Sequence, residues 1–155
     1  MNESTTLDWL KRCWGAFSFG RRLLVWDAFR PHKTELIKKQ LQSVRTDTAM
    51  IPGGCTPLLQ APDVSWNKPF KAAYLKHYEE WARTIGVSES NKTAAGNPRH
   101  PSKLQLCKWV VAAWSSLQVE LIKKSFHVCG LTTPLDGSED MNIHAVKQEG
   151  KHLRY

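Results

Sequence analysis

The sequence predicts an α/β fold, and three features of its 155 residues support that class. A short apolar run, Leu23-Leu24-Val25-Trp26, is typical of a strand buried on both faces. A helical pattern follows it, and a second apolar run at residues 48–51 ends at Pro52-Gly53-Gly54. Strand, crossover helix and strand make a βαβ unit, in which we expect the two strands to be parallel.

The elements before and within this unit follow from apolar spacing. Thr5 or Thr6 can cap a first helix over residues 6–17, which carries apolar residues at three- and four-residue spacing. Gly20 marks the turn before the first strand, which we expect at about residues 23–26. The crossover helix is predicted from about residue 35 to residue 44.

The second half of the chain is predicted to be helical. One helix begins near Pro69 and continues through residue 81, because aromatic residues recur along one face. Residues 86–101 are polar and predict a long surface loop. Helices over about 103–114 and then to Cys129 follow, and we expect the tail from Thr132 to be loosely ordered.

Composition is that of one globular domain, with 41% hydrophobic and 23% charged residues. The net charge of +8 favours a polyanionic partner, most commonly nucleic acid. The longest apolar stretch, residues 109–117, is too short to span a bilayer. The four cysteines form no metal-binding spacing, so we expect reduced, largely buried thiols in a soluble intracellular protein.

Two aspartates lie at positions where α/β folds commonly place ligand-binding and catalytic residues. Asp27 closes the first strand, and ligands of open α/β sheets gather at the carboxyl ends of the strands. Asp63 follows the Gly-rich loop after the second strand and opens a helix. Two carboxylates on neighbouring elements can hold a hard divalent cation such as Mg²⁺ or Mn²⁺. On the local pattern alone, the alternative that Asp27 only begins the turn through Pro31 stays open.

Several longer motifs carry a resemblance to a known family: LLVWDAFRPH at residues 23–32, IPGGCTPLLQAPD at residues 51–63 and NKPFK at residues 67–71. SFHVCGL at residues 125–131 and LDGSED at residues 135–140 continue it. Together they resemble the DDE transposase, or DDE superfamily endonuclease, domain of the pogo/Tigger branch of the Tc1/mariner superfamily. That branch includes domesticated host proteins similar to centromere protein B and the jerky-like proteins.

The resemblance implies an RNase H-like fold and DNA strand cleavage and transfer by a metal-bound acidic triad. By position, Asp27 corresponds to the second acid and Asp63 to the third, with Mg²⁺ or Mn²⁺ as the implied cofactor. The first acid belongs on an earlier strand, and no such strand precedes Leu7. We therefore expect a partial RNase H-like domain over residues 1–145, truncated at its N-terminus, with a helical C-terminal part and a basic tail at residues 146–155.

The expected function is DNA binding by a nuclear, transposase-derived protein with little or no strand transfer alone. Arg21, Arg22, Lys68 and Lys71 are candidate contacts to the phosphate backbone, although ordinary solvated side chains explain any one of them equally well. Two alternatives remain. The chain could be an active metal-dependent strand-transfer enzyme completed by a missing N-terminal segment, or a domesticated protein-interaction module without catalysis.

Two further residues lie near the acids in sequence. His32 could approach the metal or a phosphate, but a structural or surface histidine fits the pattern better. Trp66 is left open for stacking on a base. Four other tryptophans fall on apolar helical faces and are expected in the core: Trp14, Trp81, Trp109 and Trp114.

Overall fold

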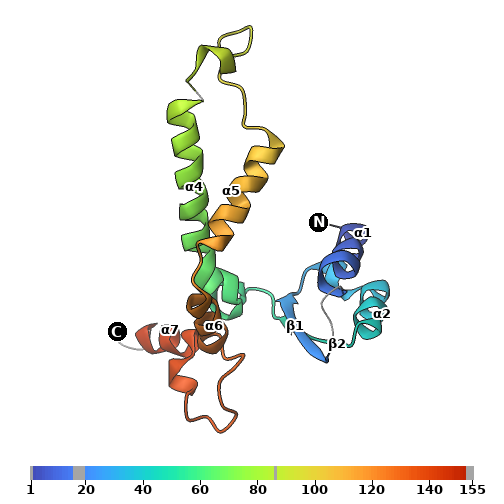
Figure 1. The fold of residues 1–155 in the computed structure, drawn as a ribbon. Coiled ribbons are helices and arrows are strands. Elements are labelled where there is room, and N and C mark those ends of the chain that lie inside the picture. Colours follow the sequence, from blue (N-terminus) through green and yellow to red (C-terminus); the bar gives the residue numbers. More distant parts are fainter. Residues whose placement is uncertain (1, 16–19, 86, 153–155) are drawn as a thin grey trace. The chain divides into compact units, whose positions relative to one another are not determined.

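The computed structural model describes residues 2–15, 20–85 and 87–152, with the backbone alone for residues 149–152. The chain divides into two compact units, Met1–Gln60 and Ala61–Tyr155. The first unit carries a small sheet with helices, and the second is built from helices (Figure 1). A mixed, helix-rich α/β architecture is thus confirmed.

The first unit opens with helix α1 (Glu3–Trp9), and Asn2 caps it. The side-chain oxygen of Asn2 accepts a hydrogen bond from the backbone N–H of Thr5 at 2.9 Å. The helix then widens into a π-helical turn, η1 (Leu10–Trp14). The helix therefore begins before the predicted threonine cap, and the predicted end at residue 17 lies outside the described residues.

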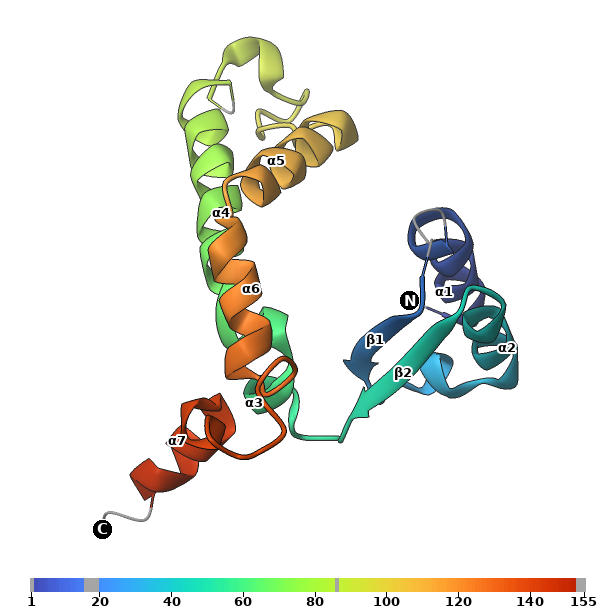
Figure 2. The same ribbon diagram turned by 60° about the horizontal axis from the view of Figure 1, so that its bottom comes forward.

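Strands β1 (Arg22–Asp27) and β2 (Thr46–Ile51) pair in parallel. A 3₁₀ turn, η3 (Arg30–Lys33), and helix α2 (Glu35–Ser43) connect them (Figure 2). The predicted βαβ unit is confirmed, and both strands are longer than the apolar runs that predicted them. A short helix, α3 (Thr56–Leu59), follows the glycine loop after β2.

Helices cover one face of this sheet within the first unit. Leu24 and Trp26 of β1 pack with apolar side chains from α1, η1 and α2, and Trp26 is 8% exposed. Leu23, which points the other way, is 55% exposed. The prediction of a strand buried on both faces is wrong for this unit, because α1 and α2 supply core side chains to one face. The buried core consists of Leu10, Trp26, Ile37 and Leu41.

The second unit begins with a π-helical turn, η4 (Pro62–Trp66), that runs directly into the 18-residue helix α4 (Asn67–Thr84). Helix α5 (Lys103–Ser115) returns beside α4 to form a hairpin (Figure 1). The connecting segment is the predicted surface loop and contains a short 3₁₀ turn, η5 (Glu89–Asn91). Helix α6 (Val119–Val128) then packs on η4.

Trp109 anchors the hairpin between α4 and α5. Three rings of α4, those of Tyr74, Tyr78 and Trp81, meet its ring with centroids 6.1–6.2 Å away and steep interplanar angles. Trp109 is 5% exposed, which confirms its predicted place in the core. Trp114 is 51% exposed, so the same prediction is wrong for Trp114, which leaves much of its ring on the surface of α5.

The segment from Thr132 onward is more ordered than its sequence predicts. It contains a 3₁₀ turn, η6 (Asp140–Asn142), and helix α7 (His144–His152). Ile143 joins these elements and packs so closely on Gly130 that an added Cβ there would lie 3.2 Å from Ile143 Cδ1. The expectation of a loosely ordered tail is therefore wrong. The contact between Ile143 and Gly130 helps to order this segment, and such a single contact cannot be recognised from the spacing of apolar residues.

The structure bears on two further predictions, the burial of the cysteines and the absence of a membrane-spanning segment among the described residues. All four cysteines are free thiols. Cys129 is buried, whereas Cys13 and Cys107 are exposed, so the expectation of largely buried thiols is wrong for those two. Among the described helices, none combines the length and apolarity needed to cross a bilayer.

Candidate nucleic-acid and metal site

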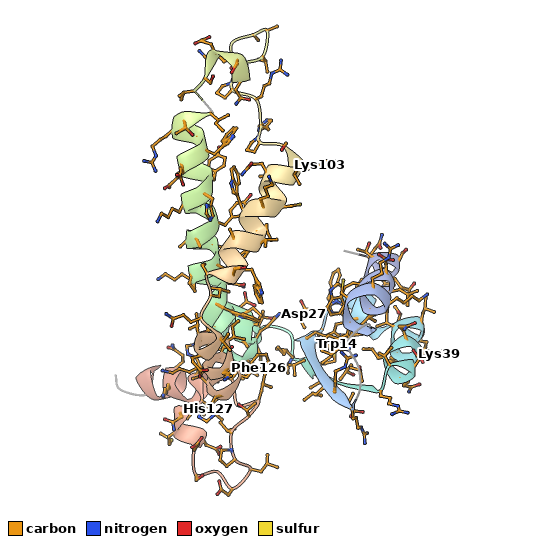
Figure 3. All side chains as sticks on the ribbon, in the orientation of Figure 1. Trp14, Asp27, Lys39, Lys103, Phe126 and His127 are labelled. Carbon is orange, nitrogen blue, oxygen red and sulfur yellow. The ribbon has the colours of Figure 1, made fainter. Side chains whose placement is uncertain are left out.

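Asp27 occupies the position that its sequence context predicts. It is the last residue of β1 and is labelled in Figure 3. Its partner in the strand register is Ile51, the last residue of β2. Because the strands are parallel, both carboxyl ends meet at one edge of the sheet, and the loop through Gly53 and Gly54 leaves from that edge. Gly54 has a φ of 82°, which a residue with a Cβ rarely adopts. Gly54 thus allows the turn by which the chain leaves β2.

His32 holds the Asp27 carboxylate in place. Its Nδ1 lies 3.0 Å from Asp27 Oδ1 and 3.2 Å from the Asp27 carbonyl oxygen. Both neighbours accept hydrogen bonds, so Nδ1 must carry the proton and donate. The imidazole also stacks on Trp26, with centroids 4.0 Å apart and an interplanar angle of 1°. His32 is therefore a positioning residue, and its side chain is 11% exposed against 46% for Asp27.

Asp63 is presented differently. It lies in the first turn of η4, its side chain is exposed, and its Oδ1 accepts a hydrogen bond from Asn67 Nδ2 at 2.9 Å. Asp27 belongs to the first unit and Asp63 to the second, and the relative placement of the units is not determined. The pairing of the two acids therefore stays a prediction.

Arg22 begins β1 and Arg21 precedes it, so both lie at the opposite end of the strand from Asp27. Arg22 is roughly 16 Å from Asp27 at about 3.3 Å per residue. Arg21 forms a two-pronged ion pair with Asp47, with Nε–Oδ2 at 2.7 Å and Nη2–Oδ1 at 3.2 Å. This hydrogen bonding and the charge of Asp47 raise the pKa of the Arg21 guanidinium. Arg21 remains largely exposed and therefore accessible to solvent.

Arg22 is held inside the first unit. Its Nη1 donates to the carbonyl oxygen of Trp14 at 2.7 Å, and its guanidinium lies 4.4 Å from the centroid of the Trp14 ring. The Trp14 indole in turn donates to Thr46 Oγ1 at 2.9 Å. Arg22 thus joins the segment before β1 to the start of the sheet, a contact between residues that sequence spacing does not predict.

Lys68 and Lys71 fit the predicted surface role. Both lie in the first turns of α4 and both side chains are exposed. In the described part of the chain, neither amino group forms an ion pair with an acid. Their positive charges are therefore available to a polyanion, one to two helical turns after Asp63.

Comparison with known proteins gives the family. The family model described as "DDE superfamily endonuclease" matches residues 1–126, a span that includes both predicted acids. The chain belongs to this family. A human protein named "Pogo transposable element with KRAB domain" is 32% identical over 145 residues, and its mouse counterpart is 30% identical. These alignments cover 91% of this chain and place it in the pogo branch.

The chain spans 23% of the length of these two pogo relatives. No solved structure gives a significant match to this DDE domain. DDE superfamily endonucleases generally use divalent metal ions. Within the described residues of this DDE domain, however, no group of three His, Cys, Asp or Glu side chains is placed to hold a metal. Both predicted aspartates nevertheless offer the oxygen ligands that hard cations prefer.

Trp66 of this DDE domain packs in an aromatic group. Its ring centroid lies 5.2 Å from that of Trp114 and 6.5 Å from that of Phe126, which Figure 3 labels on α6. Its indole nitrogen is buried and has no hydrogen-bond partner among the described residues. The reading of Trp66 as a base-stacking platform therefore receives no support, because its ring contributes to the packing of η4, α5 and α6.

Proposed function

We propose that this chain is the pogo-type DDE segment of a transposase-derived protein, that it binds DNA, and that it adopts a partial RNase H-like fold. The observation that carries the proposal is the position of Asp27. It ends a strand of a parallel βαβ unit beside a glycine-rich exit loop, within a span that matches the DDE family. Carboxyl ends of parallel strands are where open α/β sheets place ligands. A nuclear location follows from DNA as the partner.

The charge distribution supports DNA binding. The chain carries a net charge of +8, and Lys68 and Lys71, five and eight residues after Asp63, are exposed and form no ion pair among the described residues. We infer that these lysines contact backbone phosphates, which would place the carboxylate near the nucleic acid. Arg21 can add a contact where its pair with Asp47 is shared with a phosphate. Arg22 is bonded to the carbonyl oxygen of Trp14, so we assign it a structural role before a role in DNA binding.

For metal binding, Asp27 and Asp63 are the proposed ligands of Mg²⁺ or Mn²⁺. A divalent metal would supply Lewis-acid activation of the phosphodiester at this site. Two carboxylates are one fewer than the triad of this family provides, and His32 already engages one oxygen of Asp27. We therefore infer that the polypeptide of residues 1–155 performs little or no strand cleavage and transfer by itself.

A plasmid-nicking assay tests the catalytic part of this proposal. Supercoiled plasmid is incubated with the wild-type chain, Asp27→Asn, Asp63→Asn and the control Asp8→Asn, in Mg²⁺ and in Mn²⁺. Asp8 is an exposed acid on α1 that pairs with Arg12. We expect all four proteins to leave the plasmid at background levels of nicking. Robust nicking that is lost in Asp27→Asn and kept in Asp8→Asn would overturn the proposal.

Fluorescence anisotropy tests the DNA-binding part. The dissociation constant of a labelled duplex is measured over a salt series for the wild-type chain and for the double variant Lys68→Gln/Lys71→Gln. Each phosphate contact contributes a slope of about 0.9 to log K against log salt, so losing two contacts should lower the slope by about 1.8. The matched control is Lys38→Gln, because Lys38 is paired with Glu35 in the first unit. Absence of wild-type binding in low salt would refute DNA as the partner.

A further inference from the structure

A basic hollow of about 330 Å³ lies within the second unit, between η4, α6 and the segment that carries α7. Its polar lining comes from residues distant in sequence: Ser65, Lys124, Asn142, His144 and Lys147. None of its lining residues is an acid. This hollow depends on the ordered C-terminal segment, which explains why the sequence did not predict it.

Two lysines of the hollow have no acidic partner among the described residues. Lys124 and Lys147 are exposed, and neither forms an ion pair in the described part of the chain. Lys123, the neighbour of Lys124 on α6, is by contrast bonded to Glu120 at 2.9 Å. The helix therefore directs one lysine to an acid on its own surface and the next one to the hollow.

The N-terminus of α7 adds further donors. The helix begins at His144, and its preceding residue, Ile143, has no side-chain oxygen that could accept a hydrogen bond from the first-turn N–H groups. Such groups, with the positive end of the helix dipole, favour an anion. The hydroxyl of Ser65 and the amide of Asn142 add hydrogen-bond donors to the lining. The combination suits the oxygens of a phosphate group.

The hollow lies close to a predicted metal ligand. Ser65 is two residues after Asp63 on η4, so their Cα atoms lie within about 8 Å of each other at 3.8 Å per residue. A backbone phosphate bound in the hollow would therefore lie close in the DNA strand to the nucleotides that reach Asp63. Lys68 and Lys71 follow on α4, which runs directly on from η4, so further cations lie five and eight residues after that acid.

We propose that the hollow formed by Lys124, His144 and Lys147 binds a backbone phosphate of the DNA. This inference rests on the proposed function, since it specifies how the same domain holds its nucleic acid. Phosphate contacts at this place fix the register of the strand and carry no base preference. The site thus positions DNA relative to Asp63.

Salt-dependent binding of a labelled duplex by the full chain tests this assignment. Lys124→Gln and Lys147→Gln are compared with Lys123→Gln, which makes the same charge change beside Lys124 on α6. Each hollow variant should lower the salt slope by about 0.9, and the double variant by about 1.8, while Lys123→Gln leaves the slope unchanged. Wild-type binding with equal slopes in all variants overturns the hollow and leaves DNA binding intact. Absence of wild-type binding overturns both.

Lysine footprinting provides a measurement without substitutions. The chain is acetylated with a lysine reagent with and without DNA, and each lysine is followed by mass spectrometry. Protection of Lys124 and Lys147 by DNA, with Lys123 unprotected, supports the proposal. Inorganic phosphate at matched ionic strength forms the second arm. Protection by inorganic phosphate and not by DNA would reassign the hollow to a free anion and overturn the proposal.

Discussion

Replacing Gly130 with alanine should destabilise the second unit, and the structure gives the reason. Gly130 follows α6 with a φ of 74°. Its N–H donates to the carbonyl oxygen of His127, and the N–H of Leu131 donates to that of Phe126, both at 2.9 Å. These two bonds form a Schellman motif, which needs a left-handed residue at this position.

Two costs and one gain set the magnitude. Alanine in the left-handed conformation costs about 1–2 kcal/mol. Its Cβ would lie 3.2 Å from Ile143 Cδ1, and relieving such a contact in a packed site costs about 1 kcal/mol or more. The lower entropy of the unfolded chain returns about 0.4–1 kcal/mol. We therefore expect Gly130→Ala to lower the free energy of unfolding by roughly 1–3 kcal/mol.

Urea unfolding followed by tryptophan fluorescence measures this loss as a lower midpoint at unchanged slope. Gly96→Ala is the matched control, because Gly96 has a φ of 79° and no atom lies within 4 Å of its added Cβ. It should show the backbone cost without the contact. Ile143→Val removes the Cδ1 atom and should recover at least about 0.5 kcal/mol in the double variant relative to additivity. A Gly130→Ala midpoint equal to that of the wild type, or no coupling to Ile143, would refute the reasoning.

Three further predictions concern single side chains. Arg45 has a φ of 52°, so Arg45→Gly should raise the free energy of unfolding by up to about 1 kcal/mol; a lower urea midpoint would contradict this. Arg22→Gln should lower it by about 1–2 kcal/mol, because a charge-assisted hydrogen bond and ring stacking are lost, and an unchanged midpoint would count against that role. Burial raises the pKa of the Cys129 thiol, so iodoacetamide at pH 8 should modify Cys13 and Cys107 well before Cys129, as peptide mass spectrometry can show.

The βαβ unit could be predicted because its information is local. An apolar run that ends at Asp27 and another that ends at Pro52 define the strands, and the chain between them has helical spacing. One-sided burial of β1 could not be predicted from these runs. It depends on where α1 and α2 lie, and Leu23 has the same apolar character whether or not a helix covers it.

The candidate site could be predicted only in part, because its side-chain contacts also depend on tertiary structure. Asp27 at a strand end follows from sequence, but the bond from His32 depends on how the turn after β1 folds the imidazole back onto Trp26. Arg21 and Arg22 look alike in sequence, yet one pairs with Asp47 at the surface and the other is held by Trp14. Side-chain partners of this kind are set by tertiary contacts.

The direction of the Asp63 side chain depends on how many residues the π-helical turn η4 contains between Asp63 and the start of α4. A π turn holds more residues than an α turn, so it offsets the side chains before it from the regular progression of the helix that follows. Each residue of an α-helix advances the side chain by about 100° around the axis. Deleting a single residue between Asp63 and Asn67 would therefore rotate the carboxylate by roughly that angle relative to Lys68 and Lys71. Insertions and deletions in this turn, more than substitutions, would change the direction of the Asp63 carboxylate relative to Lys68 and Lys71.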